Sequence, residues 1–260
     1  MLEYRQRSAR DVEIVDGSSS YRFRCETVRE LNRCLKLFSK EPGTVKWIKT
    51  EVKPRQVFYD IGANIGVYTI VAARKTGPEG KVYAFEPHAA NFARLIVNLI
   101  QNNLQGVVIP CSVALDGEDG FSDFTYDSVN PGSSNSQFSP TSGEGVDIGG
   151  GEIAELKYAT TVERLLETGR VKAPHHIKID VDGNELRILQ GMIRLLDSPA
   201  APLTIQVEMN ADAETIMVLL QARGYQLTEK HYSSCAMRRM AQTGERQGIV
   251  GGNAIFRRVK

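Results

Sequence analysis

From about residue 57 onward, short apolar runs alternate with longer segments in which apolar residues recur every three or four positions. The runs are rich in β-branched and aromatic residues, which is typical of buried strands, and the longer segments are typical of amphipathic helices. The predicted strands are 57–61, 81–86, 107–113, 175–181, 202–208, 225–231 and 252–258. The predicted helices lie near 65–75, 89–102, 161–168, 184–196 and 212–223. This alternation predicts an α/β fold, with a mostly parallel sheet, helices on both faces and a closing pair of strands that can include an antiparallel edge.

The first 54 residues follow a different pattern. Val12–Val15 and Tyr21–Arg24 alternate in polarity around Asp16-Gly17, which predicts a short hairpin. Apolar residues from Leu31 to Phe38 then recur at helical spacing. We therefore divide the chain into an N-terminal hairpin and helix, residues 1–54, and a main domain, residues 55–260. The smaller part is expected to cover the mouth of a ligand site in the larger one.

Two irregular stretches interrupt the main pattern. Residues 116–151 are rich in glycine and serine. Loops of this length are usually either disordered or functional, so a surface excursion and a lid at the carboxyl edge of the sheet both stay open. Residues 232–252 form the second stretch, which fits either a solvated basic loop or a contact with an anionic group. Its basic residues include Arg238, Arg239 and Arg246.

The most informative motif is the turn after strand 57–61. Gly62 and Gly66 permit a tight turn before a helix, and Glu86 ends the next strand, 20 residues after Gly66. A dinucleotide site would need glycine at Asn64, where the pyrophosphate touches the backbone. Asp60 would repel a phosphate but would suit the ammonium and sulfonium of S-adenosylmethionine. The turn therefore predicts a methyl-donor pocket, in which Glu86 accepts the ribose hydroxyls.

Other residues near the same edge complete the predicted cofactor site. Pro87 and His88 directly follow Glu86, Ser112 lies at the end of the third strand, and Asp180 ends the fourth. A glycine turn by itself can also be plain packing, and it is the surrounding strand, helix and carboxylate that favour a cofactor.

Carboxylates end two neighbouring strands of the predicted sheet. Asp180 follows one apolar strand, and Glu208, with Asn210 close behind, ends the next. Ligands of open α/β folds bind at this edge, so we expect Asp180 and Glu208 to act on the reacting group. Asp182 and Glu185 have the spacing of a capping box, which explains them without a catalytic role.

The predicted catalytic set is Asp180, Glu208 and, through the basic loop, His231. A lone histidine more often satisfies local hydrogen bonds. Asp180, Glu208 and Asn210 could instead hold a magnesium ion, although such sites usually recruit more oxygen ligands than this. We favour the version without a metal.

Composition narrows the classes of partner and location. The 260 residues contain 32 Lys and Arg against 31 Asp and Glu, so no basic field attracts nucleic acid or an anionic membrane. The four cysteines lack metal or disulfide spacing, which is typical of reduced thiols in the cytoplasm. No apolar run is long enough to span a membrane. A small-molecule acceptor in the cytoplasm is the expected substrate, and the oligomeric state stays open.

The motifs together resemble the FkbM family of S-adenosylmethionine-dependent methyltransferases. The resemblance extends from about residue 57 to the C-terminus and rests on Val57–Ile70, Val82–Pro87, Leu95–Asn98 with Asn102, Thr160–Val162, Ile177–Leu186 with Gln190-Gly191, Val207-Glu208, Gly224-Tyr225 and Asn253–Phe256. It implies the class I methyltransferase, Rossmann-like fold, with a seven-stranded sheet usually ordered 3-2-1-4-5-7-6. It also implies methylation of a hydroxyl on a sugar or other small metabolite.

Asp182, Asn184 and Thr161–Glu163 depart mildly from the family pattern, which leaves the substrate open. Two alternatives also stay open: an N-methyltransferase of a small molecule, and a non-catalytic binding protein that retains the fold.

Overall fold

The computed structural model describes residues 9–134, 136–138, 153–232, 237 and 251–259. Arg238, Arg239 and Arg246 lie outside the described residues. No helix in the described part of the chain is long and apolar enough to cross a membrane.

A seven-stranded sheet, ordered β12-β13-β11-β10-β3-β4-β5, forms the centre of the molecule. Its strands are β3 (Val57–Ile61), β4 (Lys81–Phe85), β5 (Val108–Cys111), β10 (His176–Ile179), β11 (Thr204–Glu208), β12 (Tyr225–His231) and β13 (Asn253–Arg258). Only β13 runs antiparallel to its neighbours. Numbered along the chain, these strands have the order 3-2-1-4-5-7-6 from β5 to β12. The predicted fold is confirmed.

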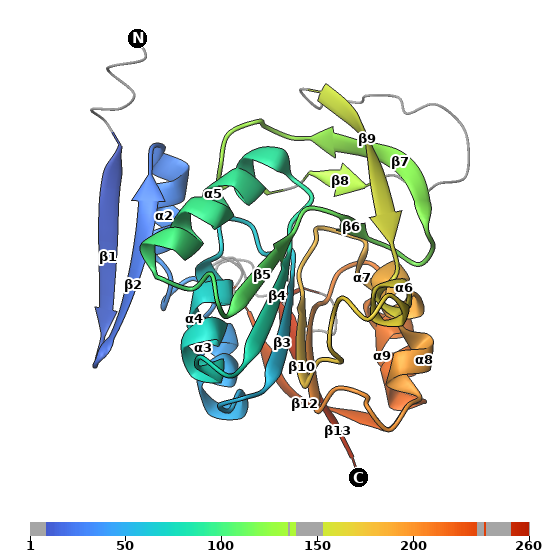
Figure 1. Ribbon diagram of the computed structural model, residues 1–260. Helices are drawn as coiled ribbons and strands as arrows, with labels where there is room; N and C mark the ends of the chain where they lie inside the picture. Colours follow the sequence, from blue (N-terminus) through green and yellow to red (C-terminus); the bar gives the residue numbers. More distant parts are fainter. Residues whose placement is uncertain (1–8, 135, 139–152, 233–236, 238–250, 260) are drawn as a thin grey trace.

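Helices cover both faces of this sheet (Figure 1). One layer contains α3 (Pro42–Glu51), α4 (Val67–Thr76) and α5 (Ala89–Gln101), and the other contains α6 (Val162–Glu167), α7 (Glu185–Gln190), α8 (Ile193–Leu196) and α9 (Ala213–Gln221). Successive strand residues point to opposite layers, so Phe58 packs in the first core and Tyr59 in the second. The helix predicted at 184–196 is interrupted at Gly191, where a Cβ atom would lie 2.3 Å from the carbonyl oxygen of Asp116.

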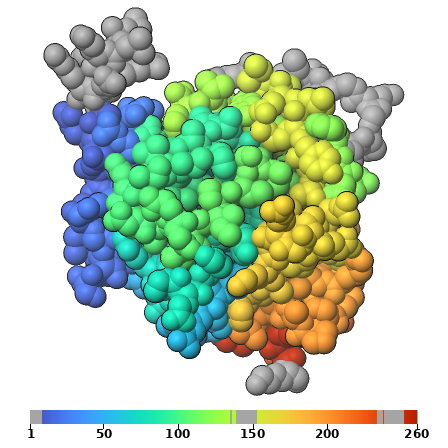
Figure 2. All heavy atoms as spheres, viewed as in Figure 1, coloured from blue at the N-terminus to red at the C-terminus, as the bar shows by residue number. Residues whose placement is uncertain are grey.

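The N-terminal hairpin pairs β1 (Arg10–Asp16) with β2 (Ser19–Cys25), and α2 (Val28–Leu35) follows. Side chains of α5 and of its C-cap residue bind the free edge of β2: the Arg24 amide donates to Asn98 Oδ1 at 2.8 Å and the Arg22 amide to Asn102 Oδ1 at 3.0 Å. The hairpin therefore lies directly on the outer side of α5, as Figure 2 shows.

The pattern failed to predict α3. Its sequence begins with Pro42-Gly43 and continues with β-branched residues, which are weak helix formers, but Trp47 and Ile48 are buried in the core.

A second sheet has four strands in the order β6-β9-β7-β8: β6 (Ala114–Leu115), β7 (Gly120–Tyr126), β8 (Gln137–Phe138) and β9 (Ile153–Thr160). It lies beyond the carboxyl edge of the main sheet (Figure 1). The prediction of an irregular segment from 116 to 151 was therefore wrong for β7. The alternation in β7, with Phe124 and Tyr126 buried and Phe121 exposed, was obscured by the glycine and serine around it.

Candidate active site

The turn between β3 and α4 has the backbone that its sequence predicts. Gly62 and Gly66 adopt φ angles of 80° and 89°, and Asn64 has a φ of 51°, in the left-handed region. A Cβ atom at Gly62 would lie only 1.9 Å from the carbonyl oxygen of Asp180. Glycine is therefore required at Gly62 by close packing against the neighbouring strand end as well as by the turn.

Glu86 stands directly after β4 and is held by this turn. Its Oε2 accepts a hydrogen bond from the Asn64 amide at 2.6 Å, and its Oε1 accepts one from the His88 amide at 2.9 Å. Burial raises the pKa of this carboxyl to about 7, although both amides favour the charged form. The carboxylate is thus fixed in orientation at the end of its strand.

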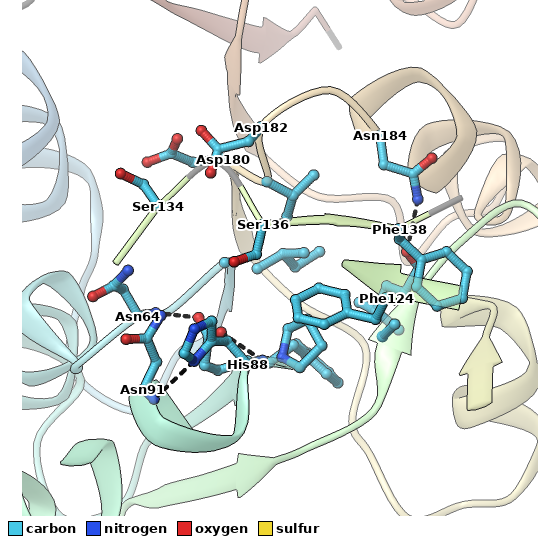
Figure 3. Close-up of a pocket in the computed structure, with 18 of the residues that line it drawn as sticks. Asn64, His88, Asn91, Phe124, Ser134, Ser136, Phe138, Asp180, Asp182 and Asn184 are labelled. Carbon is cyan, nitrogen blue, oxygen red and sulfur yellow. Dashed lines mark hydrogen bonds between the residues drawn. The ribbon is translucent and has the colours of Figure 1, made fainter. Parts of the chain in front are cut away.

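A cavity opens between this turn and the second sheet. The space between its walls is about 640 Å³ when the open solvent at its mouth is included. In Figure 3, Asp180, Asp182 and Ser134 gather at one end, while Phe124 and Phe138 line another part. The predicted cofactor residues in its wall are Gly62, Asn64, Glu86, Pro87, His88 and Asp180.

The other predicted cofactor residues lie outside this wall. Asp60 is completely buried, accepts from Thr69 Oγ1 at 2.6 Å and lies 3.6 Å from Lys178 Nζ. Its charge is thus compensated within the protein. A Cβ at Gly66 would lie 2.5 Å from Leu95, so this glycine permits helix packing, and Ser112 is exposed to solvent.

Sequence reasoning missed the residues that the second sheet and its connections contribute. The wall also contains Asn91, Val113, Ala114, Leu115, Phe124, Ser133, Ser134, Ser136, Phe138 and Asn184. The alternating pattern of residues 120–126 was the available signal for Phe124. Ser133 and Ser134 were indicated in the sequence by their resemblance to a serine pair in the variable loop of the FkbM family.

His88 and Asn91, at the start of α5, bind the segment that follows β7. His88 Nε2 lies 2.8 Å from the carbonyl oxygen of Ser128, and its Nδ1 accepts the Asn91 amide at 3.2 Å. Burial lowers the pKa of His88, so the ring is neutral and donates from Nε2. His88 therefore has a structural role at the edge of the cavity.

Asp180 and Glu208 have opposite pKa shifts. Burial would raise the pKa of Asp180, but Lys178 Nζ, 3.0 Å from its carboxylate, lowers it overall. Burial raises the pKa of Glu208 to about 8, and the negative charges of Asp180 and Glu185 add to the shift. Near neutral pH, Asp180 is therefore ionised while Glu208 is mostly protonated.

Glu208 lines a second, more open hollow beside the first. Asp182 belongs to both walls, and Gln137, Asn210 and Asp212 add polar groups to the second. The predicted capping box did not form, because Asn184 is the N-cap of α7 and makes no side-chain cap. Glu185 instead accepts from the Val181 amide at 3.1 Å.

His231 lies in neither wall. Its Nε2 is 3.1 Å from Glu229, and its ring occupies the space beside Gly43. Within the described ranges, no group of three or more His, Cys, Asp or Glu side chains is placed to hold a metal ion.

Residues 60–227 match the model of the methyltransferase FkbM domain. The chain belongs to this family. The predicted family is thus confirmed, and the chain is an S-adenosylmethionine-dependent methyltransferase.

Named relatives agree with this assignment. The hexuronic acid methyltransferase AglP of Haloferax volcanii is 27% identical over 199 residues, which cover 76% of this chain and 75% of that protein. The 31-O-demethyl-FK506 methyltransferase FkbM of Streptomyces tacrolimicus is 38% identical over 64 residues, covering 25% of this chain and 24% of that protein. These relatives support the prediction of O-methyl transfer to a small metabolite or sugar.

The fold is similar to that of a putative rRNA methylase from Clostridium thermocellum, with a TM-score of 0.51 and 9% identity. The alignment covers 85% of this chain and 97% of the other, and at this identity the similarity concerns the fold alone.

Proposed function

We propose that this FkbM-family methyltransferase binds S-adenosylmethionine in the cavity beside Glu86 and methylates a hydroxyl of a polar small molecule in the adjoining hollow. The observation that carries the proposal is the shared wall: Asp182 borders both spaces, and Asp180 and Glu208 end neighbouring strands beside it. Cofactor and acceptor can therefore meet above the carboxyl edge of the sheet.

The residues in the first cavity suit the parts of this cofactor. The fixed carboxylate of Glu86 would accept the ribose hydroxyls, and Phe85, Phe124 and Phe138 offer apolar surface for adenine. Asp180, ionised beside Lys178, would face the positively charged methionine end. When bound, the cofactor supplies an electrophilic methyl group.

The protein's part in transfer is to position the acceptor and take up its proton. With the donor bound, the acceptor oxygen would gain the methyl group as the carbon–sulfur bond breaks, and S-adenosylhomocysteine and the hydroxyl proton would be released. Glu208 in its ionised form is the proposed base, and Asp180 orients the hydroxyl. His231 is a weaker candidate, because Glu229 already binds its Nε2.

The second hollow fits an acceptor rich in hydrogen-bonding groups. The side-chain oxygens of Glu208, Asn210 and Asp212 can accept hydrogen bonds from several hydroxyl groups, as a sugar-like substrate would require. We propose a small molecule rather than nucleic acid, since the net charge of the chain is only +1. We also propose a cytoplasmic location, in keeping with the free cysteines among the described residues.

The test combines binding with turnover. Calorimetry of Glu86→Gln should show binding of S-adenosylhomocysteine weakened by about 1–3 kcal/mol, because the variant loses a charged hydrogen-bond acceptor. Unchanged affinity would remove Glu86 from the site. Glu79→Gln, in an exposed pair with Arg55 outside the cavity wall, is the matched control and should bind normally.

The acceptor is identified by mass spectrometry of small-molecule extracts incubated with methyl-labelled cofactor. A labelled ether supports hydroxyl transfer, whereas a labelled amine would favour N-methylation. Binding without transfer to any compound would favour a non-catalytic protein. Loss of activity with a chelator, restored by magnesium, would overturn the metal-free version.

A further inference from the structure

The segment Gly132–Ser134 closes one side of the cofactor cavity. Ser133 and Ser134 lie in its wall, and Ser133 is only 1% exposed. The main-chain oxygen of Ser133 accepts hydrogen bonds from Asn64 Nδ2 at 2.6 Å and Asn91 Nδ2 at 3.1 Å. The backbone of this segment is thus tied both to the cofactor turn and to α5.

The N-terminal helix α2 supplies further hydrogen bonds to this segment. Arg29 Nη1 donates to Ser133 Oγ at 2.8 Å, and Arg33 Nε donates to the carbonyl oxygen of Gly132 at 2.7 Å. A Cβ atom at Gly132, which has a φ of 84°, would lie 3.4 Å from Glu30. The segment therefore packs closely against α2 as well as accepting its hydrogen bonds.

The helix that carries these arginines is itself firmly anchored. Thr27 and Glu30 form a capping box at its N-terminus. Glu30 is fully buried and lies 2.7 Å from Arg94 Nε of α5, whose side chain is 8% exposed. A buried pair of this kind fixes relative position, since separating the charges would leave one uncompensated.

Arg29 and Arg33 make no ion pair with a carboxylate in the described part of the chain. Among the described residues, the hydrogen bonds of their side chains go to two residues of the cavity segment, Gly132 and Ser133. Two arginines that served only solubility would not be expected to bind adjacent residues of one distant segment. The geometry therefore connects α2 to the cavity wall.

We propose that Arg29 and Arg33 are positioning residues of the cofactor pocket: from α2 they hold Gly132–Ser134 in the conformation that contacts S-adenosylmethionine. The inference rests on the cofactor placement proposed above. It gives the N-terminal segment a role in binding the methyl donor, through another segment and without direct contact.

The experiment measures donor binding by the full-length protein. Arg33→Ala and the double variant Arg29→Ala/Arg33→Ala should raise the Kd for S-adenosylhomocysteine about fivefold or more, the scale of one or two lost hydrogen bonds. The KM for S-adenosylmethionine should rise similarly, while kcat at saturating donor changes little. Arg33→Lys should recover part of the affinity, because an ammonium can donate to the same carbonyl.

Arg22→Ala is the matched control: this arginine on β2 is exposed and pairs with Glu13, away from the cavity. It should leave both constants unchanged. Thermal unfolding of each variant separates positioning from folding. Unchanged Kd in the double variant, or a loss of affinity that only tracks a loss of thermal stability, would overturn the proposal.

Glu86→Gln, measured in parallel, tests the placement of the cofactor separately from the role of α2. If Glu86→Gln weakens binding and the arginine variants do not, the role of α2 is refuted and the cofactor placement stands. If none of these variants affects binding, the cofactor placement fails as well.

Discussion

At the scale of single residues, the two carboxylates at the carboxyl edge of the main sheet, Asp180 and Glu208, differ in charge state. Asp180 is kept ionised by Lys178. Glu208 instead faces the negative charges of Asp180, Glu185, Asp182 and Glu41, and no cation within the described ranges pairs with it. A base works best when its pKa lies near the working pH, which favours Glu208 for proton removal and Asp180 for orientation.

The pH dependence of turnover tests this division. Because Glu208 must lose its proton to act as a base, kcat/KM, which reports the ionisation of the free enzyme, should rise with pH through a midpoint near 8 and level off above it. Glu208→Gln should lower turnover and abolish this midpoint. If the midpoint persists in Glu208→Gln, another group is the base.

Asp180→Asn provides a second, directional test of the same pair. Removing a negative charge beside Glu208 makes its ionisation easier, so the midpoint of the kcat/KM profile should move to lower pH. Turnover at the plateau should fall, while the Kd of the cofactor changes much less. Full activity in this variant would exclude Asp180 from the reaction.

Among the elements, α3 ties the N-terminal segment to the main core. Trp47 is 3% exposed, its Nε1 donates to Thr204 Oγ1 of β11 at 3.0 Å, and its ring centroid lies 5.6 Å from that of Phe58. A boundary at residue 54 therefore separates two parts of the sequence that share one hydrophobic cluster.

Substitutions at Trp47 measure how much the packing of α3 against the main core contributes to the free energy of unfolding. Trp47→Ala should reduce the free energy of unfolding by about 3–5 kcal/mol through the cavity that it leaves. Trp47→Phe, which keeps the ring but loses the hydrogen bond, should cost less. Lys46→Ala, at an exposed pair with Glu229, is the control and should cost under about 1 kcal/mol. Equal effects of Trp47→Ala and Lys46→Ala in urea unfolding would contradict this view of α3.

At the scale of the whole molecule, burial in the main sheet makes stability depend on pH. His176 is 1% exposed, and its Nδ1 and Nε2 lie 2.7 Å from Thr204 Oγ1 and 2.9 Å from Gln56 Oε1. Burial lowers its pKa from 6.5 to about 4. Between these values the unfolded chain binds a proton that the folded chain does not, so stability is retained above pH 6.5 and lost as the pH falls toward 4.

Between pH 7.5 and pH 5, this linkage should reduce the free energy of unfolding by about 2 kcal/mol. Over the same interval, the free energy of unfolding of the His176→Gln variant should fall by about 2 kcal/mol less than that of the wild type, whatever its stability at pH 7.5. Urea unfolding at both pH values gives the comparison. Parallel losses in the two proteins would show that His176 does not titrate in this way.

The sequence by itself determined the central sheet and the chemistry of its first turn. Strand and helix periods are local, and the carboxyl ends of parallel strands must meet at one edge, so Glu86 and Asp180 could be placed together before any coordinates. Tertiary structure decided which carboxylates face the cavity. Asp60 lies next to the last residue of β3 and Asp180 directly follows β10, yet Asp60 is buried beside Thr69 and Lys178, and of the two only Asp180 lines the wall.

Tertiary structure also decided how the cavity is closed. Arg29 and Ser133 are 104 residues apart in the chain, and Asn64 and Ser133 are 69 apart. No local period relates such residues, because their contact depends on how α2, the first turn and the segment after β7 pack around α5. The sequence could therefore specify a methyl-donor turn, but only the packed fold could bring the N-terminal helix to its wall.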